Sequence, residues 1–76
     1  MLKEEEYILE GIGKRIKSLR KEKNITQFDI ASLSDIDVRL IQRLEAGKTD
    51  VRITTIYKVA KGFNMSFVEF FTYEKG

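Results

Sequence analysis

The spacing of the apolar residues constrains the fold of this 76-residue chain more than any other feature. These residues recur at intervals of three and four rather than two, and the chain contains no proline. Because an α-helix turns once every 3.6 residues, this spacing lines apolar side chains along one helical face, whereas a strand needs a period of two. The sequence therefore predicts an all-α fold with five helices, in a single domain over residues 1–76.

Three of the five expected helices are defined mainly by their apolar residues. The first ends near residues 23–24, and its predicted core stripe comprises Ile8, Ile12, Ile16 and Leu19. The fourth spans about residues 53–63, and its predicted buried residues are Ile53, Ile56, Val59 or Tyr57, Ala60 and Phe63. The last spans about residues 66–73 and begins with a capping box of Ser66 and Glu69. A chain this short buries only about 60% of its unfolded surface, so we expect association to add stability.

The second and third helices are predicted to lie close together in the chain. The second starts at Gln27, because Thr26 is a good N-cap and Asp29 completes a variant of the capping box. The third starts after Asp37 as N-cap and stops at Gly47. Two helices joined by a four-residue turn match the helix-turn-helix signature, here at about residues 27–46. Their predicted inward-facing residues are Ile30, Ala31, Ile41 and Leu44.

The side of the third helix that the core does not use carries residues suited to DNA. Arginine can donate two hydrogen bonds to guanine, glutamine can pair with adenine, and an aliphatic side chain suits the thymine methyl group. On an arbitrary helix such residues would simply be solvated, and only the surrounding motif favours base or phosphate contact. Leu40 leaves two interpretations open, contact with DNA or cover for the helix junction. The free side holds Val38, Arg39, Gln42 and Arg43.

Four segments in order resemble the Cro and phage-repressor (XRE) family of helix-turn-helix regulators. They are GKRIKSLR at 13–20, TQFDIA at 26–31, IQRLEAGK at 41–48 and the closing segment at 60–71. The resemblance implies a five-helix, lambda-repressor-like DNA-binding domain. It also implies that Gln27 and Lys48 contact the DNA backbone and that Arg20 and Glu45 form a structural ion pair. The residues that it places at base edges are Val38, Arg39, Gln42 and Arg43.

Four positions depart from the family pattern. Asp35 stands where relatives usually have glycine because the turn needs a positive φ, which Asp tolerates better than most residues. Val51 replaces a common proline, and Arg52 replaces a common Ser or Thr cap. Phe28 stands where some activating relatives carry acidic residues that touch RNA polymerase, so contact of that acidic type is not supported. The compact layout and aromatic last helix look like controller proteins of restriction-modification systems.

Composition excludes several kinds of chemistry. With no cysteine and no histidine, the chain lacks thiol and imidazole nucleophiles, a Ser/His/Asp triad and a His or Cys zinc site. The acidic residues near the start are expected to be a solvated helix N-terminus. We therefore predict no enzyme activity, no metal and no cofactor. The start has no apolar signal region, and no apolar run exceeds three residues, so we expect neither secretion nor a membrane span and place the protein in the cytoplasm.

The charge of the chain is unevenly distributed along the sequence. The net charge is only +2, although residues 14–25 contain six basic residues and one acidic residue. We expect this basic run to be a solvated helix face over the core stripe.

The leading hypothesis is a homodimeric, sequence-specific transcriptional regulator that binds double-stranded DNA at a palindromic operator. Its predicted dimer interface lies on the last helix and comprises Val68, Phe70 and Phe71. One alternative is an antitoxin that represses its own operon and masks a toxin, with Phe28 and Leu33 as an apolar partner surface. Another is a protein-interaction module without DNA affinity, which the low net charge favours. RNA polymerase or a toxin is the further partner that these hypotheses imply.

Overall fold

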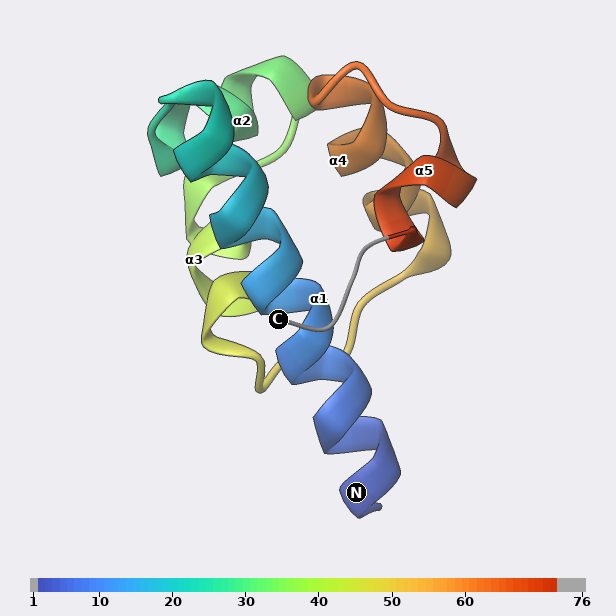
Figure 1. Cartoon of the computed structure of the whole chain (residues 1–76). Helices are drawn as coiled ribbons and strands as arrows, with labels where there is room; N and C mark the ends of the chain where they lie inside the picture. Colours follow the sequence, from blue (N-terminus) through green and yellow to red (C-terminus); the bar gives the residue numbers. More distant parts are fainter. Residues whose placement is uncertain (1, 73–76) are drawn as a thin grey trace.

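Five α-helices make up the part of the chain that the computed structural model describes, residues 2–72 (Figure 1). The all-α prediction is confirmed, and these residues form no strand. The last helix ends two residues before its predicted end, and Tyr73 lies outside the described residues. The helices are α1 (Lys3–Lys23), α2 (Gln27–Ser34), α3 (Val38–Ala46), α4 (Ile53–Gly62) and α5 (Phe67–Phe71).

The helix contacts place α2 and α3 between the long helix α1 and α4. Helix α1 packs against α3, while α2 packs against both α3 and α4, and α5 packs against α4. In Figure 1 the N-terminal turns of α1 project beyond the rest of the molecule. Helices α2 and α3 therefore sit on a scaffold made by α1 on one side and α4 on the other. Across residues 2–72, every helix is too short or too polar to span a lipid bilayer.

The core confirms most of the predicted stripes, corrects two positions and decides one alternative. Ile8 is exposed and Leu9 is buried in its place. Adjacent residues on a helix point about 100° apart, so only one of the two can point into the protein. Ile53 is exposed because it is the first residue of α4, and of the pair Val59 or Tyr57 it is Val59 that is buried. The connected core comprises Ile12, Ile16, Leu19, Ile30, Ala31, Ile41, Leu44, Ile56, Val59, Ala60, Phe63 and Phe70.

The two adjacent phenylalanines of α5 divide between the core and the surface. Phe70 is 0% exposed, so its prediction as a dimer contact is wrong. Its ring fills the space between α5 and the rest of the core, and Phe71 packs edge-on against it with 5.2 Å between the ring centroids. Phe71 remains 42% exposed and Val68 71% exposed. Only these two of the three predicted residues are accessible to a partner.

The predicted helix caps of α2 and α5 are confirmed. The hydroxyl of Thr26 accepts from the backbone N–H of Asp29 at 3.0 Å, and the carboxylate of Asp29 accepts from the backbone N–H of Thr26 at 2.9 Å. Ser66 and Glu69 form the same reciprocal pair at the start of α5. These hydrogen bonds stabilise the ionised carboxylates and lower the pKa of both Asp29 and Glu69. Each cap satisfies backbone donors that the first helical turn leaves unpaired.

Helices α1 and α3 approach each other closely at Gly13. A Cβ atom at this position would lie 2.5 Å from the carbonyl oxygen of Leu44 and 2.9 Å from that of Glu45. Both oxygens belong to the backbone, so no side chain can rotate away to make room. Gly13 therefore allows the C-terminal end of α3 to rest directly on α1.

We predict that Gly13→Ala lowers the free energy of unfolding by about 1–3 kcal/mol, as expected for overpacking. Alanine is the better helix former, so the clash must outweigh a gain of roughly 1 kcal/mol. Gly11→Ala, two residues earlier in α1, is the control, and we expect it to leave stability unchanged or to raise it by up to about 1 kcal/mol. Chemical denaturation measures both. Equal stabilisation by the two substitutions would show that α1 and α3 are not in backbone contact.

Candidate nucleic-acid interface

The turn between α2 and α3 is fixed by its own backbone. Asp35 adopts the left-handed conformation with φ of 57°, so the prediction that the turn needs a positive φ at this position is confirmed. The N–H groups of Asp35 and Ile36 donate to the carbonyls of Ser32 and Ala31, which ends α2. The side chain of Ile36 packs against the core. This turn sets the angle at which α3 leaves α2.

Helix α3 has one buried face and one polar face. Ile41, Leu44 and Glu45 are buried, as expected for the core side of the helix. Arg39, Gln42 and Arg43 are exposed. Val38 and Leu40 are half-buried against the core, so part of each side chain is used for packing and part remains accessible.

The start of α3 carries an ion pair within the polar face. The Asp37 carboxylate accepts from the backbone N–H of Arg39 at 2.8 Å, which caps the helix. It also accepts from the guanidinium of Arg39, through Nε at 3.4 Å and Nη2 at 3.1 Å. These bonds lower the pKa of Asp37 and raise that of Arg39. Both groups therefore remain ionised near neutral pH.

A buried carboxylate ties α3 to the two helices before it. Glu45 accepts from Arg20 on α1, through Nε to Oε2 at 2.6 Å and through Nη2 to Oε1 at 2.9 Å. Gln27 at the start of α2 donates its side-chain amide to the same Oε1 at 3.0 Å. The side chain of Glu45 is only 2% exposed, and its hydrogen bond with Arg20 raises the pKa of that arginine. The ion pair expected between Arg20 and Glu45 is present, and Gln27 adds a third member.

The remaining predicted DNA contact, Lys48, is exposed beyond the end of α3. It follows Gly47, whose φ of 72° closes the helix, and it lies in the same loop as Asp50. Of the two predicted backbone contacts, Gln27 lies at the start of α2 and Lys48 lies after the end of α3. A backbone contact by either residue stays a prediction.

Sequence reasoning missed the role of Arg15. This residue belongs to the basic run that was expected to be solvated, yet its guanidinium reaches the end of α5. Its Nε donates to the carbonyl of Phe70 at 2.7 Å, and its Nη2 donates to the carbonyls of Glu69 and Thr72 at 3.0 and 3.4 Å. A cation there pairs with carbonyls that a helix C-terminus leaves free. The separation of more than 50 residues hides this contact from any local sequence pattern.

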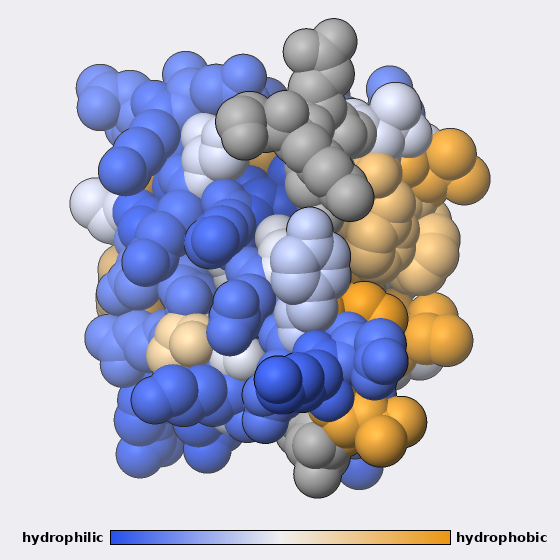
Figure 2. All heavy atoms as spheres, turned by 60° about the horizontal axis from the view of Figure 1, so that its bottom comes forward, coloured by the Kyte–Doolittle hydropathy of each residue, from blue (hydrophilic) through white to orange (hydrophobic). Residues whose placement is uncertain are grey.

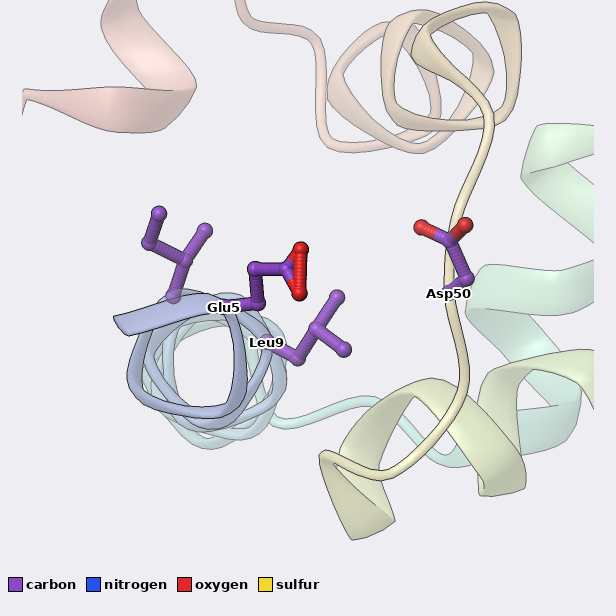
Figure 3. Close-up of a pocket in the computed structure, with 4 residues that line it drawn as sticks. Glu5, Leu9 and Asp50 are labelled. Atoms are coloured by element: carbon purple, nitrogen blue, oxygen red, sulfur yellow. The ribbon is translucent and has the colours of Figure 1, made fainter. Parts of the chain in front are cut away.

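A shallow pocket lies apart from the predicted DNA contacts, between the first turns of α1 and the loop before α4. In Figure 3 the side chains of Glu5 and Leu9 extend from α1 toward Asp50. Its lining, completed by Ile8, combines two carboxylates with two aliphatic groups. None of these residues belongs to the polar face of α3, and residues 2–72 contain no acidic cluster suited to a metal ion.

Comparison with known proteins agrees with this geometry. A family model described as helix-turn-helix matches residues 16–70. A helix-turn-helix-type transcriptional regulator of Sinorhizobium fredii, y4dJ, is 30% identical over 61 residues, which cover 80% of this chain and 79% of that protein. The chain belongs to the XRE-type helix-turn-helix family of transcriptional regulators. Control protein C.MunI of a Mycoplasma species is 31% identical over 79% of this chain and 82% of its own length.

Two of the other relatives of this helix-turn-helix protein are much longer than this chain. Antitoxin PezA of Streptococcus pneumoniae is 38% identical over 58 residues, but the matched part is 76% of this chain and only 37% of the antitoxin. A transcriptional regulator from Vibrio cholerae superposes with a TM-score of 0.82 at 27% identity, over 88% of this chain and 38% of the regulator. A mutant of the restriction-modification controller protein C.Esp1396I superposes with a TM-score of 0.79 at 32% identity, over 86% and 87%. These structures confirm the five-helix fold.

We predict that the pair of Arg20 and Glu45 stabilises the helix-turn-helix unit strongly. Arg20→Ala leaves a buried carboxylate without its cation, which costs about 3–5 kcal/mol of the free energy of unfolding. Glu45→Ala should also lower stability, and the double variant should lose less than the sum of the two. Lys21→Ala, next to Arg20 but exposed, serves as the control and should change stability by less than about 0.5 kcal/mol. Strict additivity in a thermal-unfolding cycle would contradict the interaction.

Proposed function

We propose that this chain is a sequence-specific regulator of transcription, acting in the cytoplasm as a homodimer on a two-fold symmetric DNA site. The observation that carries the proposal is the polar face of α3. It presents Arg39, Gln42 and Arg43 to solvent, while a buried ion pair holds the opposite side of the helix against α1. A helix that is rigidly held and exposed along one polar side is what insertion into a major groove requires.

The side chains of α3 divide between base reading and support. Arg39 and Arg43 can each donate two hydrogen bonds to a guanine, and Gln42 can pair with an adenine. Val38 keeps part of its surface free for a thymine methyl group while its remainder packs inward. Gln27 and Lys48 are assigned to phosphates, which position a protein on DNA without reading its sequence.

The dimer is assigned to the exposed apolar side chains of α5. Figure 2 shows apolar side chains gathered on the right side of the molecule, which is also the side on which α5 lies in Figure 1. Val68 and Phe71 of α5 are exposed, and Phe71 is supported by Phe67 and Phe70 with 5.2 Å between ring centroids in each pair. Two copies of such a patch satisfy a two-fold axis, where each surface meets itself. A dimer also doubles the number of bases read.

A second candidate function is that of an antitoxin which represses its own operon. It is favoured by the similarity to antitoxin PezA over 76% of this chain. Phe28 and Leu33 on α2 are 70% and 62% exposed and offer a surface for a toxin. The compact relatives C.MunI and C.Esp1396I favour instead a controller protein, because this chain covers most of their length.

One experiment tests DNA binding and returns the site. The full chain is used to select sequences from a random DNA library, and its affinity for the selected site is measured over a range of salt concentrations. Because phosphate contacts release counterions, log K should fall linearly with log salt. A chain that enriches no sequence and shows no salt-dependent affinity would overturn this proposal and favour the alternative of a protein-interaction module.

We predict that Arg43→Ala weakens binding to the selected site by roughly 1–3 kcal/mol per half-site and relaxes the preference at one base position, because one bidentate contact is lost. Lys48→Ala is the matched comparison, since it also removes one exposed positive charge. It should weaken all sequences alike and reduce the salt slope by about one. Binding to a panel of single-base variants of the site distinguishes the two. Undiminished selectivity of Arg43→Ala would show that the base-reading face lies elsewhere.

We predict that Phe71→Glu converts the protein into a folded monomer that binds its site much more weakly. The substitution places a charge at a self-complementary apolar contact, where it would meet its own copy. Phe28→Glu is the control, because it makes the same change at an exposed aromatic residue of α2 and should leave the dimer intact. Sedimentation at tens of micromolar protein measures both. A monomeric parent protein, or a selected site without two-fold symmetry, would rule out this dimer.

A further inference from the structure

We infer that Asp37 is a specificity-determining residue, which orients the guanidinium of Arg39 for base reading at the entrance of α3. The inference rests on the proposed function, because it concerns the DNA-facing side of the same helix. Asp37 itself need not touch a base. It acts on the DNA through the position and the charge of Arg39.

The two residues are joined by three hydrogen bonds to one carboxylate. Oδ1 of Asp37 accepts from the backbone N–H of Arg39 at 2.8 Å and from its Nε at 3.4 Å, and Oδ2 accepts from its Nη2 at 3.1 Å. The backbone bond fixes the carboxylate relative to the helix. The fixed carboxylate then holds the guanidinium by the edge formed by Nε and Nη2. Few of the rotamers that an exposed arginine normally samples retain these bonds.

The geometry leaves one edge of Arg39 available for DNA. A guanidinium carries five N–H groups in a rigid plane. With the Nε edge on the carboxylate, the end formed by Nη1 and Nη2 still has two donors side by side. Two parallel donors match O6 and N7 of guanine. The first residues of a recognition helix are the ones that meet base edges, and Arg39 is the second residue of α3.

The charge of Asp37 adds a penalty against wrong sequences. The side chains of Arg39 and Asp37 are 81% and 54% exposed, so the carboxylate would remain near the phosphates when α3 enters a groove. It offsets the attraction of Arg39 for phosphate, which every DNA sequence offers equally. Only a guanine at the matching position can form a bidentate contact with Arg39. Discrimination therefore rises while non-sequence-specific affinity falls.

The test separates this role from helix capping. Asn caps helices about as well as Asp, so Asp37→Asn keeps the cap and removes the charge. We expect its melting temperature to match that of the parent. Asp35→Asn is the matched control, because it removes the same charge two residues away, and Asn tolerates the positive φ at that position. Within residues 2–72 the carboxylate of Asp35 makes no hydrogen bond to Arg39.

The full-length parent chain first selects its site from a random DNA library. The affinities of Asp37→Asn, Arg39→Ala, the double variant and Asp35→Asn are then measured on that site and on all its single-base variants. Arg39→Ala should relax one base pair in each half-site. Asp37→Asn should relax the same pair by roughly two- to fivefold per half-site, because exposed ion pairs contribute modestly. The double variant should show the same base preference as Arg39→Ala alone.

Several results would overturn the inference. Asp37→Asn could keep its full preference at the base pair that Arg39→Ala relaxes, or it could strengthen binding to all sequences equally, as we expect for Asp35→Asn. Either result would leave Asp37 with a general electrostatic role only. Unchanged base preference in Arg39→Ala would contradict the reading role of Arg39. These outcomes leave the proposed function standing, whereas a parent chain that selects no site overturns both.

Discussion

The pairing of the buried Glu45 carboxylate with Arg20 determines how the recognition helix is held. Removing a carboxylate from water costs several kcal/mol, and only a well-placed cation with further hydrogen bonds offsets that cost. Arg20 and Gln27 supply those bonds from α1 and from the start of α2. Any tilt of α3 would lengthen these hydrogen bonds and leave the buried Glu45 carboxylate without its partners. The burial of Glu45 therefore makes the orientation of the helix specific. Gly13 completes the arrangement by letting the α3 backbone rest on α1.

The parts of the fold that could be predicted are those encoded by neighbours in sequence. The capping boxes at Thr26 and Ser66, the cap at Asp37 and the left-handed Asp35 depend on residues within one turn of each other. Periodicity also found most of the core. It could not choose between adjacent residues, such as Phe70 and Phe71, because both fit a stripe that is about 100° wide. Tertiary packing makes that choice, and a single sequence does not contain it in local form.

The candidate site shows the same division between local and distant information. Its exposed side chains follow from the helix register, so Arg39, Gln42 and Arg43 were located in advance. The sequence predicts Asp37 only as a helix cap and does not predict its pairing with Arg39, although the two residues are two positions apart. Arg15 was missed for the opposite reason, since its partners lie at the far end of the chain. A residue that plays two roles, as Asp37 does, is harder to predict from a local pattern than a residue that plays one.

Arg15 and Arg20 lie on the same helix, one fastened to the end of α5 and the other to α3. In the proposed dimer, α1 would therefore connect the two-fold axis at α5 rigidly to each recognition helix. The distance between half-sites would then be built into the fold rather than adjusted by a flexible linker. One base pair more or less between half-sites turns one of them by about 35° around the duplex, since B-DNA has roughly 10 base pairs per turn. We expect such a dimer not to follow that rotation, so the length of the spacer would contribute to its specificity alongside the bases in each half-site.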